Sequence, residues 1–442
     1  TTTSTTTVTP SPEATDKESS PMGKKEKKEK QSPSTPIMIR FANFLVWLAT
    51  QHTTVLCSVL VIVGLFWVLC FPAICVTTGE LKMRGTYLSE NSLNSHFDSS
   101  VFSHPQVAEA LHRDDVFRTV QANKQELAEK VAQEMRDAGL EVSMQRFDEQ
   151  GAEGFNVYGI LRGARASGLE SMVLATSFAD FGTKQRDPSA LSLGLGLLGA
   201  MSDVRWLSKD VIFLATSSSL KRDEGLGLGL HKWLEAYHSA SVSDDFITAG
   251  RIRAAVVVDM PPGTYQSLAV PLPGINGGLP NLDLFNCWRN FWIADGHPHS
   301  LMLPAADANS DVFSQIFQLL QKPLSGQPRV LFYVDRLLNM FRFMFQLAFA
   351  PSGAHSHFLR YNIDAITLEP SSTFDPERTW GIPLSQPKGS SFSTVGFVQA
   401  VEHLMHTLSN LEERLHQSFY FYFLPNEIMF VSIDEYVFSL GI

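Results

Sequence analysis

Apolar residues follow three different patterns along the chain. Residues 1–36 have no apolar periodicity and are rich in Thr, Ser, Pro and Lys. Such a composition cannot bury enough surface to offset the entropy of ordering, so we predict a disordered tail. Thr54–Val76 is an uncharged apolar run, long enough to cross a hydrocarbon core of about 30 Å as a helix. After this run, short apolar stretches alternate with helical patterns.

The alternating region predicts an α/β domain. Near-continuous apolar runs typical of buried strands lie at Asn156–Gly163, Ser171–Ser177, Asp210–Thr216, Arg253–Met260 and Asp364–Glu369. Helix-period patterns cover 123–140, 189–201, 279–292, 334–350 and 397–419. Strands that alternate with helices in this way favour a mainly parallel sheet covered on both faces, which is a three-layer α/β fold.

These patterns divide the chain into five predicted parts: a tail at 1–36, a juxtamembrane segment at 37–53, a membrane helix at 54–76, a large domain at 77–417 and a final segment at 418–442. The final segment is aromatic but contains Glu427, Asp434 and Glu435. Because charges at the centre of a membrane span are costly, we expect an interfacial or second membrane segment that is imperfect and truncated. We also expect the sequence to be a fragment.

The charged residues predict how the chain is oriented in the membrane, and they argue against nucleic acid as a partner. The net charge is −10, and the predicted domain has no basic stripe, which argues against nucleic acid as a ligand. Basic residues cluster at Lys24–Lys30, before the apolar run. The positive-inside preference therefore predicts a cytoplasmic N-terminus and a large domain on the opposite side of the membrane.

The cysteines do not indicate a disulfide framework or a nucleophile. Cys57, Cys70 and Cys75 lie in the apolar run, and only Cys287 lies elsewhere. Cys287 is surrounded by a helical apolar pattern, so we interpret it as a buried, inert thiol.

Acidic and histidine side chains follow several predicted strands. Asp259 ends one strand, His355 precedes another, and Asp187, Asp223 and Glu224 follow two more. Carboxylates and imidazoles from separate strand ends are what a zinc site requires. Their order resembles that of the co-catalytic zinc aminopeptidases, whose fold is shared by transferrin receptor and glutaminyl cyclase. The resemblance implies a bridging role for Asp187, an acid-pair role for Asp223 and Glu224, and ligand roles for Asp259 and His355.

The ligand set is incomplete compared with that family. Thr176 or Ser177 stands where the family has its first histidine, and Ala354 replaces the acidic residue before the late histidine. We therefore interpret Asp187, Glu224, Asp259 and His355 as remnant ligand positions. The alternative is a membrane-anchored metal-dependent peptidase or peptide-bond-forming enzyme, in which Asp259, Glu224 and His355 hold zinc.

A second resemblance covers residues 80–425. The stretches TYLSEN, NVYGILR, KDVIFLAT, HKWLEAYH, INGGLPNLDLFN, HFLRYNIDAITL and NLEERLHQSFYFYFLP resemble the GPI-anchor attachment subunits of GPI transamidase. The resemblance implies residence in the endoplasmic reticulum membrane, with a luminal aminopeptidase-like domain. It also implies a non-catalytic role in binding the GPI glycolipid and precursor proteins that carry a C-terminal GPI signal. The peptide cleavage and acyl transfer would belong to a separate caspase-like cysteine protease subunit.

The glycolipid would be contacted at the luminal membrane interface, since its acyl tails stay in the bilayer. Two motifs of the second family are predicted there, and their polar residues are Tyr87, Ser89, Glu90, Asn91, Gln417 and Ser418. No cofactor is expected, except a divalent cation that Gln417 and Ser418 would share with the GPI phosphate. Two alternatives remain: these residues only anchor helix ends, or the chain is an adaptor that contacts only other subunits.

Overall fold

The computed structural model describes residues 37–77, 85–90, 93, 99–120, 123–149, 151–179, 188–221, 226–239, 246–260, 265–294, 301–302, 312–349, 351–371 and 393–441. The chain divides into two compact parts, Thr1–Val61 and Ile62–Ile442. The tail predicted at 1–36 lies outside the described residues.

The chain begins its described part with two helices, α1 (Ile37–Gln51) and α2 (Thr53–Thr77). Within the described residues, α2 is the one helix whose length and composition allow it to cross a membrane, over Thr53–Pro72. Only 17% of its apolar window is buried, which is too little for the core helix of a soluble domain. The predicted apolar span is therefore a helix with an exposed apolar surface.

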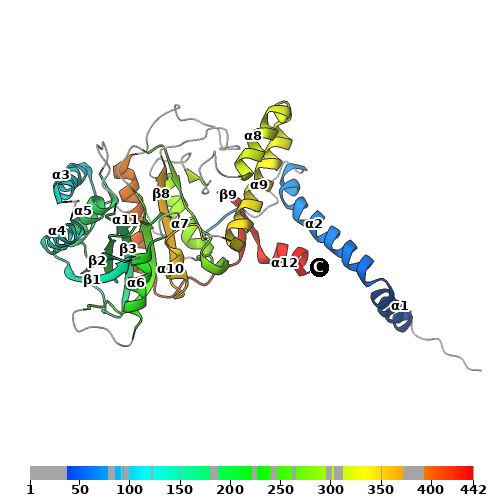
Figure 1. Cartoon of the computed structure of the whole chain (residues 1–442), viewed down its shortest axis with the longest axis horizontal. Coiled ribbons are helices and arrows are strands. Elements are labelled where there is room, and N and C mark those ends of the chain that lie inside the picture. The colour runs from blue at the N-terminus through cyan, green and yellow to red at the C-terminus, as the bar shows by residue number, and fades with distance from the viewer. Residues whose placement is uncertain are drawn as a thin grey trace, which may run out of the picture. The chain divides into compact units, whose positions relative to one another are not determined.

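The larger part contains a mixed sheet with a parallel centre (Figure 1). Its strands are β1 (Glu141–Glu149), β2 (Ala152–Leu161), β3 (Glu170–Ser177), β4 (Asp210–Thr216), β5 (Arg251–Val258), β6 (Ser267–Ala269), β7 (Leu301–Met302) and β8 (Asp364–Ser371). Their order is β1-β2-β4-β3-β5-β8-β6-β7. The four central strands β4, β3, β5 and β8 are parallel, whereas β1, β2 and β6 pair antiparallel with their neighbours towards the centre.

Helices cover both faces of this sheet. They are α4 (Lys124–Asp137), α5 (Ala190–Met201), α6 (Leu228–Tyr237), α7 (Leu282–Ala294), α10 (Ser356–Leu359) and α11 (Thr394–Asn410). Helix α3 (His104–Val120) packs on α4 and α5, whereas α8 (Val312–Leu324) and α9 (Pro328–Phe349) pack against each other. Alternate residues of β3 enter two separate cores: Met172 and Leu174 pack with α4, α5, α7 and α11, while Val173 and Ala175 pack with α6 and α10. The predicted three-layer α/β fold with a mainly parallel sheet is confirmed.

The last described residues form a hairpin and a helix. Strands β9 (Tyr422–Asn426) and β10 (Met429–Ser432) pair antiparallel, and α12 (Ile433–Gly441) follows. Tyr422, Leu424 and Phe430 are fully buried, and Gly85 forms a bridge to Met429. Most of this hairpin is therefore part of the domain core, and the interfacial or membrane role predicted for 418–442 stays a prediction. Helix α11 also ends at Asn410, earlier than the pattern over 397–419 predicts.

Candidate functional site

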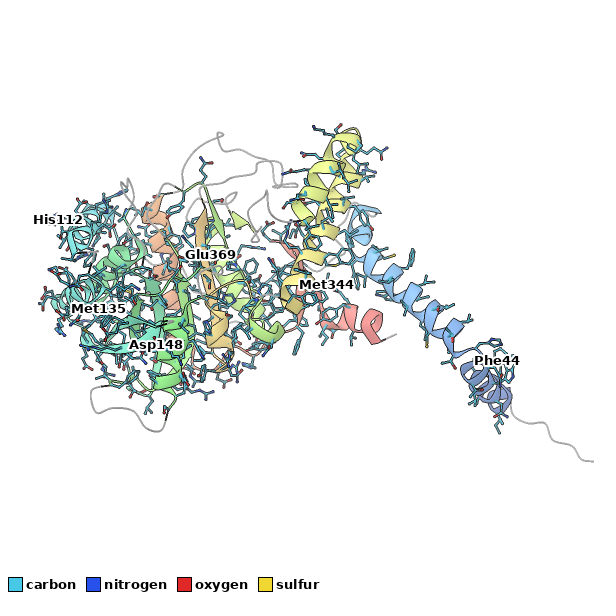
Figure 2. All side chains as sticks on the ribbon, in the orientation of Figure 1. Phe44, His112, Met135, Asp148, Met344 and Glu369 are labelled. Atoms are coloured by element: carbon cyan, nitrogen blue, oxygen red, sulfur yellow. The ribbon has the colours of Figure 1, made fainter. Side chains whose placement is uncertain are left out.

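The carboxyl ends of β3 and β5 line an open hollow. Asp259 lies directly after β5 and lines this hollow together with Ser177 and Lys221. Glu369, which is labelled in Figure 2, lies on β8. It is next to Asp259 in the sheet, since β5 and β8 are paired with Val258 opposite Leu368. Burial and the neighbouring Asp259 raise the pKa of Glu369 to about 8. Asp259 and Glu369 are thus a coupled carboxyl pair at the sheet edge where α/β folds place ligands.

His355 does not face this hollow as a metal ligand would. Its side chain is fully buried, its Nδ1 lies 2.8 Å from the Thr367 hydroxyl, and its Nε2 lies 3.0 Å from the Leu272 carbonyl oxygen. Burial lowers the pKa of His355 to about 4, so the imidazole is neutral. With both ring nitrogens engaged by the protein, His355 serves as a core hydrogen-bonding residue, and its interpretation as a former ligand position stays a prediction.

The predicted metal site is described only in part. Asp187, Asp223 and Glu224 lie outside the described residues. Among the residues that the structure describes, no group of three or more His, Cys, Asp or Glu side chains is placed to hold a metal ion. Within the described ranges, Asp259 and Glu369 supply two carboxylates at the strand ends, whereas a zinc site takes three or four protein ligands.

A second cluster of polar residues lies where the chain that follows α2 crosses α7. Three residues of α7, each separated by one helical turn, bind this chain segment. Arg289 donates to the Thr86 hydroxyl, Asn286 Nδ2 donates to the Tyr87 carbonyl at 2.8 Å, and Asp283 accepts the backbone N–H groups of Ser89 and Glu90, each at 2.9 Å. The polar face of α7 therefore fixes the path of residues 86–90.

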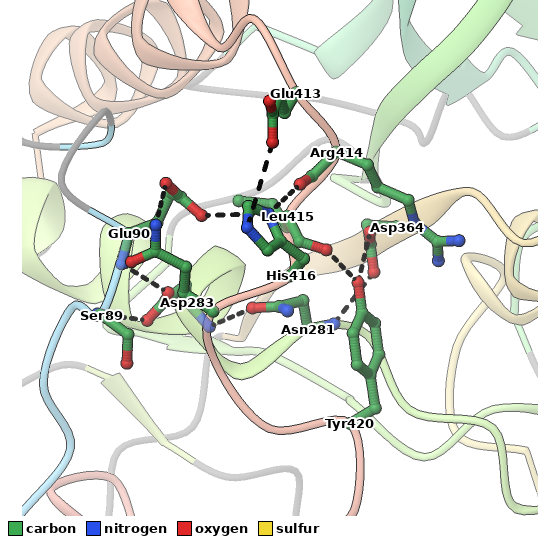
Figure 3. Close-up of polar contacts among 11 residues, drawn as sticks. Ser89, Glu90, Asn281, Asp283, Asp364, Glu413, Arg414, Leu415, His416 and Tyr420 are labelled. Atoms are coloured by element: carbon green, nitrogen blue, oxygen red, sulfur yellow. Dashed lines mark hydrogen bonds and ion pairs between the residues drawn. The ribbon is translucent and has the colours of Figure 1, made fainter.

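The stretch 416–418 reaches the same place from the far end of the chain (Figure 3). Gln417 Nε2 donates to Glu90 Oε1 at 3.0 Å, and His416 Nδ1 lies 3.6 Å from Glu90 Oε2. The Ser418 hydroxyl bonds the Asp283 carboxylate. Glu90 is buried, whereas Gln417 and His416 are exposed. We call Tyr87, Ser89, Glu90, Asp283 and 416–418 the α7 cluster.

The α7 cluster rests on the start of α7. Asn281 precedes this helix and its Oδ1 accepts the N–H of Asp283 at 2.9 Å, as a helix N-cap does. The N–H of Asn281 in turn donates to Asp364 Oδ1 at 3.0 Å. Arg414 Nε lies 3.5 Å from Asp364 Oδ2, and the Tyr420 hydroxyl donates to the same oxygen at 3.3 Å. These contacts join the end of the sheet to the segment before β9, so the α7 cluster has a rigid base.

Burial also shapes the electrostatics of the α7 cluster. The pKa of Asp283 is raised by burial, although the hydrogen bonds from Ser89, Glu90 and Ser418 oppose this effect. Burial likewise raises the pKa of Asp364, against its hydrogen bonds and the charge of Arg414. Two carboxyl groups, Glu90 and Asp283, thus lie together, and a cation or a hydrogen-bond donor fits beside them better than a bare anion.

The structure brings together most of the residues predicted to bind glycolipid. Ser89, Glu90, Gln417 and Ser418 meet around Asp283, while the Tyr87 ring is 52% exposed and lies 6.3 Å from the Phe430 ring. Asn91 lies outside the described residues. Sequence reasoning missed Asp283, although the pattern Asn281-Leu-Asp283 before an apolar helix is a recognisable start signal. The glycolipid role of these residues stays a prediction.

Two similar solved structures are a Porphyromonas gingivalis glutaminyl cyclase and the Legionella pneumophila LapA aminopeptidase. The first has 13% sequence identity and a TM-score of 0.38, covering 70% of this chain and 99% of that chain. The second has 12% identity and a TM-score of 0.37, covering 73% of this chain and 79% of that chain.

Two curated relatives share more of the sequence. The GPI transamidase component GAA1 of Saccharomyces cerevisiae is 25% identical over 381 residues, which are 83% of this chain and 53% of that protein. The GPI transamidase component gaa1 of Schizosaccharomyces pombe is 28% identical over 295 residues, which are 65% of this chain and 44% of that protein. The chain therefore spans about half the length of these relatives.

A family model described as "Gaa1-like, GPI transamidase component" matches residues 153–442, which is well over half of the chain. This range includes α7, the strand-end hollow and the stretch 416–418. The chain belongs to the Gaa1-like family of GPI transamidase components.

Proposed function

We propose that this chain acts as a non-catalytic subunit of GPI transamidase, which helps to hold the glycosylphosphatidylinositol and the precursor protein during anchor attachment. Membership of the Gaa1-like family supports the assignment to this complex. The peptide cleavage and acyl transfer would then be carried out by a separate cysteine protease subunit. The proposed setting is the endoplasmic reticulum membrane, with the N-terminus cytoplasmic and the large domain luminal, as the basic cluster before α2 indicates.

One observation carries the glycolipid part of this proposal: two motifs more than 300 residues apart in sequence meet in the α7 cluster, a short stretch after the end of α2. A glycolipid whose acyl tails lie in the bilayer presents its polar head at that level. Tyr87, His416 and Gln417 are the exposed members of the cluster, and His416 and Gln417 lie against the buried Glu90. They offer an aromatic ring, an imidazole and an amide, which suit a sugar-phosphate head.

The carboxyl groups of the α7 cluster restrict how a phosphate group can bind there. Glu90 and Asp283 would repel a phosphate that approached alone. A divalent cation between the carboxyl groups and the phosphate removes this repulsion, since hard cations accept oxygen ligands from both. Gln417 and Ser418 supply neutral oxygens for the same purpose. Their hydrogen bonds to Glu90 and Asp283 hold both side chains beside these carboxyl groups.

Photo-crosslinking to a photoactivatable GPI tests this proposal in membranes that contain the assembled complex. The chain is expressed in cells that lack their own subunit. We expect Tyr87→Ala combined with Gln417→Ala to reduce crosslinking strongly, and chelation of divalent cations to reduce it in the parent. Gln318→Ala is the matched control, since Gln318 is an exposed glutamine on α8.

The same cells report the function by surface display of a GPI-anchored reporter. We expect the Tyr87 and Gln417 variant to lose display at equal expression and complex assembly, while Asp259→Asn retains it. Loss of display by Asp259→Asn alone would favour an enzyme at the strand-end hollow instead. Unchanged crosslinking in the Tyr87 and Gln417 variant would contradict a glycolipid site at the α7 cluster.

A further inference from the structure

Helices α8 and α9 form a hairpin with an uncovered apolar surface. On α8, Val312, Ile316 and Leu319 are 63%, 38% and 75% exposed, and their spacing puts them on one stripe of the helix. On α9, Phe345 and Phe349 are 51% and 75% exposed and lie one turn apart, with ring centroids separated by 5.0 Å. Large apolar side chains gathered in this way mark an interaction surface.

The two helices join these residues into one surface. The ring of Phe313, next to Val312, lies 6.2 Å from the Phe345 ring in an edge-to-face arrangement. The inner side of α8 is used differently, because Ser314 and Phe317 are buried there and Ser314 accepts a hydrogen bond from Arg342 of α9 at 3.1 Å. Helix α9 therefore covers one side of α8, and the apolar stripe on the other side of α8 stays exposed.

The charges of the hairpin are unusual for this chain. Residues 312–349 contain four basic residues, Lys322, Arg329, Arg336 and Arg342, and one acidic residue, Asp335, which gives a net charge of +3. The whole chain has a net charge of −10. Arg336, Arg342 and Asp335 are buried, so the exposed charges of the hairpin are Lys322 and Arg329, both positive and both beside its turn.

Helix α9 is also bonded to the apolar helix. The Tyr333 hydroxyl donates to the carbonyl oxygen of Leu69 at 2.9 Å. Leu69 lies three residues before Pro72, the end of the apolar window of α2, which corresponds to about 5 Å along a helix. If α2 spans a bilayer, Tyr333 lies at the depth of the headgroups, where tyrosine is favoured. The turn of the hairpin then lies at the membrane surface.

We propose that the α8–α9 hairpin lies on the bilayer, with the exposed stripe of α8 and the two phenylalanines of α9 inserted among the lipid headgroups and upper acyl chains. Amphipathic helices with an apolar face and basic flanks bind membranes in this way. Lys322 and Arg329 contact lipid phosphates, and Tyr333 fixes the hairpin to α2. This contact is separate from the glycolipid site at the α7 cluster and does not depend on it.

A photo-crosslinking amino acid tests the position of the hairpin in the full chain reconstituted into phosphatidylcholine vesicles. It is placed either at residue 319, on the apolar stripe, or at residue 318, its exposed polar neighbour. We expect lipid adducts at 319 to exceed those at 318 on the order of ten-fold, because the two side chains point about 100° apart around the helix. Equal yields at both positions, or no lipid adduct at 319, would overturn the proposal.

Two further comparisons separate lipid from other occupants. Adding phosphatidylserine is expected to raise the adduct yield at residue 319, because each basic residue near an anionic surface strengthens binding about five-fold. The double substitution Lys322→Glu with Arg329→Glu is expected to cancel this increase. In membranes that contain the assembled complex, the probe at 319 is expected to label lipid again. A polypeptide adduct at 319 in those membranes would show that another subunit covers the stripe, which would also overturn the proposal.

Discussion

The carboxylate of Asp283, on the first turn of α7, accepts the backbone N–H of Ser89 at 2.9 Å across 194 residues of sequence. The other carboxylate oxygen accepts the N–H of Glu90 at the same distance. Backbone donors buried without an acceptor are costly, so these two bonds determine where the segment after α2 can lie. Asp283 therefore connects the exit of the apolar helix to the domain.

Replacing Asp283→Asn is expected to destabilise the protein by about 2 kcal/mol, because an amide offers only one acceptor oxygen and places an NH₂ group against a backbone N–H. The midpoint of urea unfolding measures this loss. Asp115→Asn is the matched control, since the Asp115 side chain is 73% exposed on α3. An equal midpoint for the two variants would show that the contacts of Asp283 do not contribute to stability.

His355→Ala is expected to destabilise the domain by about 3 kcal/mol, since it leaves a cavity and removes the partner of the buried Leu272 carbonyl and Thr367 hydroxyl. Thermal unfolding measures the effect, and His416→Ala at an exposed position is the control. We also expect added zinc to leave the melting temperature of the parent unchanged. A zinc-dependent increase that His355→Ala abolishes would instead show that His355 is a ligand.

Glu369→Gln is expected to become more stable relative to the parent as the pH rises from about 4.5 to about 8. In the folded parent the pKa of Glu369 is raised to about 8, whereas the ordinary value is 4.5. Between these values the unfolded chain loses its proton while the folded protein must keep it, so the parent loses stability with increasing pH. Glutamine has no proton to lose.

Urea unfolding of both proteins at about pH 5 and about pH 8 measures this difference, and Glu153→Gln at an exposed position is the control. If the difference in unfolding free energy between the two proteins did not change with pH, Glu369 would have the same pKa in the folded and the unfolded chain. Burial and Asp259 would then not affect the ionisation of Glu369.

The central strands could be predicted from sequence because a strand buried on both faces is apolar at nearly every position. β3, with the sequence ESMVLATS, shows this pattern. The end of α11 could not be predicted, because the apolar period continues beyond Asn410. There Lys209 Nζ donates to the carbonyl oxygens of Ser409 and Leu411, so a residue 200 positions away stabilises the helix end.

The candidate site, like the end of α11, could be predicted from the sequence only in part. The motifs 86–91 and 417–418 could each be recognised from sequence. The meeting of their described residues depends on Asp283, whose side chain lies at the start of a helix between them. The role of His355 depends on Thr367 and Leu272, which only the folded chain brings to its ring. A histidine before a strand has the same local sequence whether it binds a metal or a hydroxyl.

Cys287 provides a test of whether the core around α7 stays closed. Its side chain is buried, and burial raises the pKa of the thiol far above the usual range. Because the thiolate is the reactive form, alkylation by iodoacetamide in native conditions is expected to be at least about 100-fold slower than at an exposed thiol. Gln318→Cys supplies that exposed thiol in the same chain, and mass spectrometry of peptides compares the two sites.

Comparable alkylation rates at the two thiols would mean that α7, and with it the base of the α7 cluster, opens frequently. Rapid labelling of Cys287 only in urea would show that the buried packing of α7 protects it.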